Sequence, residues 1–348
     1  MPDLKRFDPD TANHDYFKAR ILYLNTLRKE EKPDDPPRSL EASITNAKSW
    51  KMIEHARLEL WNLWEDDAII AELFAAVSLD EENKHVIDGD VNILQPYRRK
   101  GYSKLLLTKL VEMAERYERT LLISHTSSRI PAGGLFAEYL GAKKGIETHT
   151  NQLELTEVDK RLLETWTRNA ATTTNEFELG LWKGYPEEEI DAVATMIEVM
   201  NTAPRDNLDV NDWKVTPEML RQFDAYNKAQ GIEFWMMYVR HKPSGELAGY
   251  TQTFWDPENP ENLRQGDTGV VPKYRGHGLG KWLKAAMIQK VLLERPVVKR
   301  IRTGNADSNA PMLAINHALG FKPYIAETVW QIEVQKLKDY LQRDSSKQ

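Results

Sequence analysis

The segment KYRGHGLGKWLK, which runs from Lys273 to Lys284, places closely spaced glycines and cations just before a helical stretch. Glycines lack a Cβ and so let the backbone approach a ligand closely. The first N–H groups of a helix have no intrahelical partner, and the helix dipole adds positive charge there. This pattern predicts a site for a phosphate or pyrophosphate group. Its residues are Arg275, Gly276, His277, Gly278, Leu279, Gly280 and Lys281.

Other glycine motifs fit this segment less well. A Walker loop needs Gly-Lys followed by Ser or Thr, whereas Trp282 follows Lys281 here. A dinucleotide fingerprint needs an early strand, Gly-x-Gly-x-x-Gly and a ribose-binding acid about 20 residues later, which we do not find. A glycine pair before a helix can also simply ease packing, so the motif must be weighed with its neighbours.

An imperfect copy of the segment, PYRRKGYSKLLL, begins at Pro96. Arg98 and Arg275 lie 177 positions apart, and the segments YLGA at Tyr139 and ALGF at Ala318 lie 179 positions apart. A nearly constant offset is what a duplicated domain predicts. We therefore expect an N-terminal domain over 1–158, a linker over 159–186 and a C-terminal domain over 187–348. The copied loop comprises Arg98, Arg99, Lys100, Gly101, Tyr102 and Ser103.

Strands and helices that alternate along both halves predict an α/β fold with a mixed sheet. We expect helices over 15–30, 104–119, 133–142, 187–201, 217–231, 279–293 and 309–321. We expect strands over 57–64, 68–79, 85–94, 119–126, 150–158, 266–271, 298–305 and 326–334, and a hairpin over 234–255. A polar helical tail from 335 is expected to fray.

Composition narrows the classes of function. The chain has 348 residues, a formal net charge of −6 and no cysteine. Its length allows two cores, and the absence of cysteine excludes disulfides, thiolate catalysis and cysteine-ligated metals. The acidic balance disfavours nucleic-acid binding, which needs a basic surface. We found neither a membrane-length apolar run nor a signal peptide, so we expect a cytoplasmic protein without a membrane partner or metal.

The loop and its neighbours together resemble the GCN5-related N-acetyltransferase (GNAT) family. Arg275 to Gly280 matches that family's Arg/Gln-x-x-Gly-x-Gly/Ala pyrophosphate loop, and TGNADSNAPMLAINHALGF is similar to its last strand–helix unit. QGDTGVVPKYRGHGLGKWLK and MNTAP (Met200–Pro204) more narrowly resemble tandem acetyltransferases distantly similar to mycothiol synthase. The resemblance implies two tandem acyl-CoA N-acyltransferase domains. It is close only over about 200–330.

This resemblance implies acetyl-CoA as cosubstrate and direct attack by an amine, with no acyl-enzyme. Acetyl-CoA would lie between the strands of Val270 and Ile301. The backbone of Val270 and Val271 would pair with the pantetheine arm, and a backbone N–H near Val270 would stabilise the oxyanion. Asn305 and Asn309 would also contact CoA, Asn309 from the start of the last helix.

Two departures concern the catalytic groups. Many family members carry a Tyr in the last helix as acid toward the CoA thiolate, but the matching residue here is Asn316. Many also carry a Glu before the Val-x-Pro strand as base. Here Asp267 is the only carboxylate in that region, serving directly or through water, although it could also simply face solvent. Asp267 and Asn316 are the candidate catalytic residues.

The first half keeps the shape of the loop more than its chemistry. Ala137 stands where an acid Tyr would be, and we find no catalytic set there. Whether this half binds CoA stays open. We expect an acetyltransferase acting on the primary amine of a small molecule in the C-terminal half, as a monomer or homodimer. A non-catalytic acyl-CoA-binding or sensing protein is the alternative. An aminoacyl-tRNA-using transferase is disfavoured by the negative charge.

Overall fold

The computed structural model describes residues 2–173 and 175–345, without the side chains of 169–173, 344 and 345. The chain forms two compact units, each built from several segments. Unit 1 comprises Met1–Glu147, Arg205–Asn211 and Ala326–Gln348, and unit 2 comprises Thr148–Pro204 and Asp212–Ile325. Each unit holds a mixed sheet between helices, as the alternation of elements predicts.

Unit 1 is a sheet in the strand order β1-β2-β3-β4-β5-β12, in which β4 and β5 are parallel. Its elements are β1 (Asp3–Arg6), α1 (His14–Glu31), α2 (Leu40–Ser49), β2 (Ala56–Glu65), β3 (Ala68–Ser78), β4 (Val86–Ile93), α3 (Tyr102–Arg116), β5 (Leu121–Ser127), α4 (Pro131–Leu140), the end of β12 (Lys322–Glu333) and α10 (Val334–Ser345).

Helices cover both faces of this sheet. Apolar residues of α3 and α10 pack on one face, and those of α1 and α2 pack on the other. Neighbouring residues of a strand point to opposite faces, so a strand between two helical layers is apolar on both sides. In β3, Leu73 accordingly contributes to the α3 core, while Phe74 packs toward α1 and α2.

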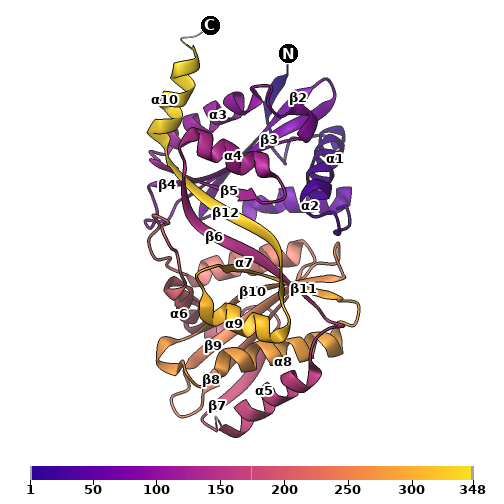
Figure 1. The fold of residues 1–348 in the computed structure, drawn as a ribbon, viewed down its shortest axis with the longest axis vertical. Helices are drawn as coiled ribbons and strands as arrows, with labels where there is room; N and C mark the ends of the chain where they lie inside the picture. Colours follow the sequence, from indigo (N-terminus) through magenta and orange to yellow (C-terminus); the bar gives the residue numbers. More distant parts are fainter. Residues whose placement is uncertain (1, 174, 346–348) are drawn as a thin grey trace. The chain divides into compact units, whose positions relative to one another are not determined.

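Unit 2 repeats this plan in the strand order β7-β8-β9-β10-β11-β6, in which β10 and β11 are parallel (Figure 1). Its elements are the end of β6 (Lys143–Glu154), α5 (Lys160–Thr173), β7 (Phe177–Trp182), α6 (Ile190–Ile197), α7 (Pro217–Ala229), β8 (Glu233–His241), β9 (Leu247–Trp255), β10 (Asn262–Val270), α8 (Leu279–Glu294), β11 (Arg300–Ala306), α9 (Ala310–Leu319) and the start of β12.

The core of unit 2 also has two layers. Residues of α5, α8 and α9 pack on one face of the sheet, and α6 and α7 cover the other. Strand β8 is buried on both sides, with Trp235 and Met237 facing the α8 layer and Phe234 and Met236 facing α6 and α7. Glycines end α4 and α9 where expected, since Gly141 and Gly320 have positive φ.

The two halves of the sequence exchange their last elements. β6 and α5 complete the first repeat in sequence, but from Thr148 onward they belong to unit 2. β12 and α10 complete the second repeat, but from Ala326 onward they belong to unit 1. The domain limits at 158 and 187 stay predictions. The segment expected to be a linker contains α5 and β7, and its residue 174 lies outside the described residues.

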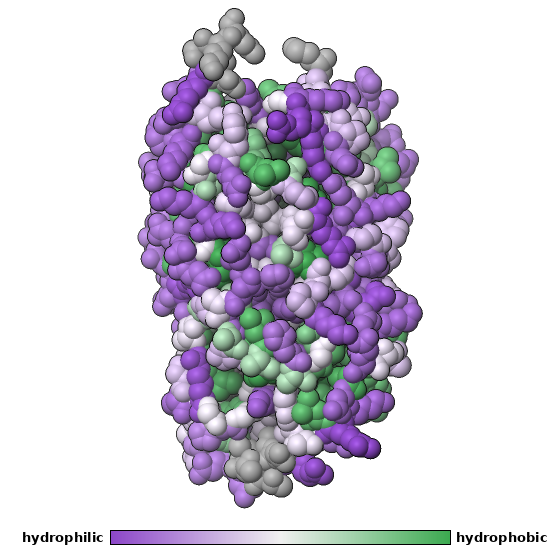
Figure 2. Space-filling model, in the orientation of Figure 1, coloured by the Kyte–Doolittle hydropathy of each residue, from purple (hydrophilic) through white to green (hydrophobic). Residues whose placement is uncertain are grey.

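The order of strands and helices predicted for both halves is confirmed, with a few additions. β1, α2, α5 and β7 were not expected. The tail was expected to fray, which is wrong for the part of α10 that packs on α3, since Leu337 is fully buried. Residues 346–348 of the tail lie outside the described part. Hydrophilic residues cover most of the face shown in Figure 2.

Candidate functional site

The predicted anion loop of unit 2 joins β10 to α8 through a short 3₁₀ turn, Pro272–Tyr274. Gly276 and Gly278 both adopt left-handed backbone conformations, with φ of 85° and 74°. Gly278 is the N-cap residue of α8, and no side chain caps the helix there. Left-handed backbone is strained for residues with a Cβ, so these positions favour glycine.

Open space surrounds the loop glycines. A Cβ built on Gly276 or Gly278 would have no atom within 4 Å apart from those of its own chain neighbours. Glycine is therefore not needed at these positions to avoid a steric clash. It is favoured by their left-handed backbone conformation. The uncapped N–H groups at the start of α8 and the open backbone form a cradle suited to a pyrophosphate. Lys281 adds a cation in the first turn, 5.5 Å from the ring of Trp166.

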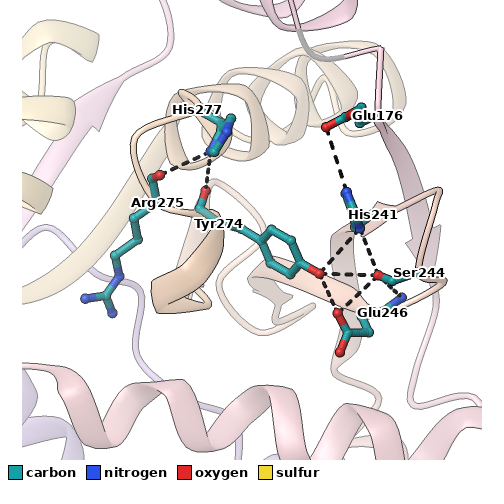
Figure 3. Close-up of polar contacts among 7 residues, drawn as sticks. All are labelled: Glu176, His241, Ser244, Glu246, Tyr274, Arg275 and His277. Carbon is teal, nitrogen blue, oxygen red and sulfur yellow. Dashed lines mark hydrogen bonds and ion pairs between the residues drawn. The ribbon is translucent and has the colours of Figure 1, made fainter.

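Arg275 and His277 brace the loop from inside. The Arg275 guanidinium donates to the Val270 carbonyl at 3.0 Å and to the Thr202 hydroxyl at 2.6 Å. His277 Nδ1 lies 3.1 Å from the carbonyls of Tyr274 and Arg275, and Figure 3 shows its ring turned back onto the loop. Both side chains therefore stabilise the conformation of the loop.

Thr202 belongs to the MNTAP motif, whose 3₁₀ helix Glu198–Thr202 lies against β10. A Cβ on Gly269 would come within 2.4 Å of Val199, so glycine is needed there for this close approach. The motif therefore supports both β10 and Arg275.

A polar cluster fixes the other end of the loop to the β8–β9 turn (Figure 3). Tyr274 donates to Glu246, which also accepts from Lys273 at 2.6 Å and from Ser244 at 3.1 Å. The bonds from Lys273, Tyr274 and Ser244 lower the pKa of Glu246 to about 2. The cluster holds the loop in place and leaves the α8 N-terminus open.

The strands beside the loop part from each other. The backbones of β10 and β11 are paired from Asn262–Arg300 to Gln265–Thr303. Their pairing ends there, although β10 continues to Val270 and β11 to Ala306. A bulge in β10 between Gln265 and Thr268 coincides with this point. The edge of β10 beyond Gln265 can therefore accept an added strand-like ligand. Val271 pairs back to Ala248, and the Val270 carbonyl is shared with Arg275.

Asp267 lies in this bulge. Its side chain reaches solvent, yet desolvation by the surrounding protein raises the pKa of its carboxyl, and Arg264 opposes the rise. A ligand in solvent can therefore reach this carboxylate, while the protein around it still disfavours its charged form. A raised pKa suits a group that accepts a proton near neutral pH.

Two tyrosines that the sequence analysis missed lie near Asp267. Burial raises the pKa of the Tyr185 and Tyr250 phenols, and the charge of Asp267 adds to both shifts. Tyr185 accepts from Gln252 at 3.2 Å, whereas the buried hydroxyl of Tyr250 has no hydrogen-bond partner among the described residues. For Tyr250, the sequence did contain a signal, because Tyr250, Gln252 and Phe254 alternate along one face of β9.

The asparagines predicted around the site occupy different environments. Asn309 caps α9 and accepts from Met312 N at 3.4 Å. Asn316 is fully buried and donates to Asn305 Oδ1 at 2.6 Å. Asn316 in turn accepts from the buried Lys284 at 2.6 Å, a residue that sequence reasoning did not single out.

The copied loop in unit 1 has the same backbone shape. A 3₁₀ turn, Gln95–Tyr97, precedes it, and Gly101 is the left-handed N-cap of α3 with φ 84°. Arg99 takes the place of Gly276 and keeps a positive φ of 65° despite its side chain. Arg98 donates to the Ile93 carbonyl, as Arg275 does to Val270, and pairs with Glu30 at 2.6 Å.

The strands of unit 1 also part beside this loop, but a side chain connects them. β4 and β5 are paired from Val86–Leu121 to Asp88–Ile123, although β4 continues to Ile93 and β5 to Ser127. Beyond that pair, Asp90 accepts from the Ser124 hydroxyl at 3.0 Å and from the His125 backbone N–H at 2.8 Å. The Asp90 carboxylate therefore bridges the two strands where unit 2 leaves its strands apart.

Neither metal nor membrane features stand out in the described ranges. Within 2–173 and 175–345, no three His, Cys, Asp or Glu side chains are grouped so that they could hold a metal ion. None of the helices in those ranges combines the length and the apolar character of a membrane span.

Comparisons with known proteins agree with the geometry. The model of the acetyltransferase (GNAT) family matches residues 23–142 and 198–321. A tandem GNAT protein from the clavulanic acid biosynthesis pathway, solved without acetyl-CoA, has a TM-score of 0.75 at 22% identity over 96% of this chain and 99% of that one. A GCN5-related N-acetyltransferase from Sphaerobacter thermophilus has a TM-score of 0.59 at 12% identity over 96% of both chains. No curated protein matched the sequence. The narrower similarity to mycothiol synthase stays a prediction.

Proposed function

Since the chain belongs to the acetyltransferase (GNAT) family, we propose that its unit 2 moves an acetyl group from acetyl-CoA to a primary amine of a small molecule. The observation that carries this proposal is the open glycine cradle at the start of α8, beside the point where β10 and β11 part. Bound acetyl-CoA would supply an activated thioester.

The residues of unit 2 divide the work between binding and proton transfer. The backbone of Gly276 to Lys281 binds the pyrophosphate, and the edge of β10 beyond Gln265 orients the pantetheine arm at Val270. The backbone of Val271 is already engaged, since its N–H donates to Ala248 and its carbonyl accepts from Tyr274. Asp267 accepts the proton of the acceptor amine, directly or through water. Tyr185 and Tyr250 lie close enough to Asp267 to feel its charge, and the negative charge of this carboxylate favours a cationic amine.

Unit 1 is less suited to the same chemistry. The side chain of Arg99 replaces the open Gly276, and Asp90 bridges β4 and β5 where a pantetheine arm would otherwise pair. Ala137 stands at the position of Asn316. We therefore assign acetyl transfer to unit 2.

A matched pair of substitutions tests this assignment. Gly278→Glu and Gly101→Glu each place a charged side chain on a left-handed N-cap glycine in open space, so both carry similar strain. We expect Gly278→Glu to abolish acetyl-CoA binding in calorimetry and thiol release with an amine panel, and Gly101→Glu to preserve both. Loss of both activities only in Gly101→Glu would move the active site to unit 1. Unchanged binding in Gly278→Glu would refute the proposed cradle.

The burial of Asn316 favours a second candidate, an acyl-CoA-binding protein without turnover. An amide cannot protonate a thiolate, and Asn316 is already engaged with Lys284 and Asn305. Acetyl-CoA binding without thiol release across a broad panel of amines would support this candidate against the enzyme.

A further inference from the structure

A buried polar network lies in unit 2 where β10 and β11 part. Lys284 on α8 donates to Gln265 Oε1 at 3.2 Å and to Asn316 Oδ1 at 2.6 Å. Gln265 is the last residue of β10 paired with β11, and Asn316 connects to Asn305 on β11. The ammonium group is thus tied to both strands at the point where their pairing ends.

Lys284 is buried without a counter-ion. Its exposed fraction is 1%, and it makes no ion pair within the part of the chain that the structure describes. Its neighbours from β10 and α9 are the amides of Gln265 and Asn316, and the ring of Phe321 lies 5.3 Å from Nζ, so none of them titrates. Burial lowers the pKa of Lys284 to about 7. Such a cation costs stability unless a partner offsets its desolvation.

Unit 1 shows that the fold does not need this network. Leu107 is the sixth residue of α3, as Lys284 is of α8, and it lies in the apolar core. Ala137 is the seventh residue of α4, as Asn316 is of α9.

The matching strand position is apolar as well. Two positions after the core residues Ile87 and Leu263 stand Gly89 in β4 and Gln265 in β10. Gly89 faces α3, since a Cβ there would lie 2.6 Å from Leu110. The same helix-on-sheet contact is therefore made without any polar group in one unit and around a buried cation in the other.

We propose that the Lys284 ammonium, acting through Asn316 and Asn305, stabilises the negative charge that develops on the CoA sulfur in unit 2; this rests on the proposed function. In acetyl transfer a C–N bond forms between the amine and the acetyl carbon, and the C–S bond breaks with its electron pair on sulfur. An ammonium acceptor first loses one proton to Asp267, directly or through water, and its nitrogen loses a second proton to water as the amide forms, while Lys284 keeps its own. Lys284 is thus a positioning residue. Its charge stabilises the thiolate that an acid in the last helix would otherwise protonate.

The test compares binding of CoA with binding of desulfo-CoA, which lacks the sulfur, by calorimetry at pH 6.5. Lys284→Met removes the charge, and Gln265→Glu keeps the lysine but gives it a carboxylate partner. Leu107→Met is the matched control in unit 1. We expect the wild type and the control to prefer CoA by about tenfold, less than the roughly hundredfold of a direct charge-stabilising donor. Both test variants should lose this preference and keep their affinity for desulfo-CoA.

The outcomes separate this inference from the proposed function. A wild type that binds neither ligand would end both. A wild type that binds both ligands equally, or a Lys284→Met variant that keeps the preference, would end the inference alone. If Lys284→Met fails to fold, the test rests on Gln265→Glu, because an ion pair preserves the network while cancelling its charge. A Gln265→Glu variant that still prefers CoA would then end the inference.

Discussion

The ionisation of Lys284 can be measured through the stability of the apo protein. The pKa of this lysine falls from 10.5 to about 7 on folding, because burial disfavours the charged form. Between these pH values the unfolded chain holds a proton that the folded chain has released. The free energy of unfolding should therefore rise with pH, by about 1.4 kcal/mol per pH unit from this residue. The total over the interval is about 5 kcal/mol.

The Lys284→Met variant isolates this contribution. Met is close to Lys in size, and leaving the amide oxygens of Gln265 and Asn316 unpaired costs about 1–3 kcal/mol each, independent of pH. The unfolding free energy of the variant minus that of the wild type should be constant below pH 7. From pH 7 to 10.5 it should fall by about 1.4 kcal/mol per unit.

The assay is urea unfolding at pH 6 to 10. The free energy of unfolding is taken from the transition whose midpoint the substitution shifts. Leu107→Met at the matching position of unit 1 should give a curve parallel to the wild type at every pH, since an apolar exchange of similar volume has no linked proton. Parallel curves for Lys284→Met and the wild type would refute the reasoning, because they would mean that the lysine titrates alike in the folded and unfolded chains.

The remaining predictions concern Asp267, the copied loop and the last helix. Asp267→Asn should lower kcat/KM by about a hundredfold while the affinity for acetyl-CoA stays unchanged. The activity of the wild type should fall as the pH drops through the raised pKa of this carboxyl. Equal rates for the variant and the wild type would exclude Asp267 as the base. Arg99→Gly should raise stability by up to about 1 kcal/mol in urea unfolding, because it relieves left-handed strain, and a loss of stability would show that the side chain contributes more than its strain costs. Asn309→Ala should lower stability by about 1 kcal/mol through loss of the N-cap, whereas an unchanged urea midpoint would contradict that role.

Local patterns sufficed to predict most elements of this fold. The helix predicted to begin at 217 and the hairpin predicted over 234–255 are both present, and both carry short-range signals, the N-cap Thr216 and the turn residue Gly245. The 177-residue offset between Arg98 and Arg275 also predicts what is seen, two loops with the same backbone shape. These inferences succeed because the conformation of a turn or helix end depends on a few adjacent residues.

Features set by long-range partners were not predictable in this way. The alternation in β6 and β12 identifies strands but does not say which sheet they complete, so their exchange between the units was missed. Leu337, Tyr340 and Leu341 form a short apolar stripe in an otherwise polar tail, but the core on which they pack becomes visible only in the structure. Lys284 reads as an ordinary helix lysine, because Gln265 and Asn316, which enclose it, are 19 and 32 positions away.

The duplication supplies a comparison that a single domain could not. Both repeats build the same loop, and both anchor its arginine to the preceding strand, at Ile93 in one and Val270 in the other. Features common to both units therefore belong to the architecture, and features found in only one need another explanation. The open Gly276, where unit 1 has Arg99, and the buried Lys284, where unit 1 has Leu107, are of the second kind. Burying that cation costs stability that Leu107 avoids, so the reason for keeping Lys284 is to be sought in what unit 2 binds.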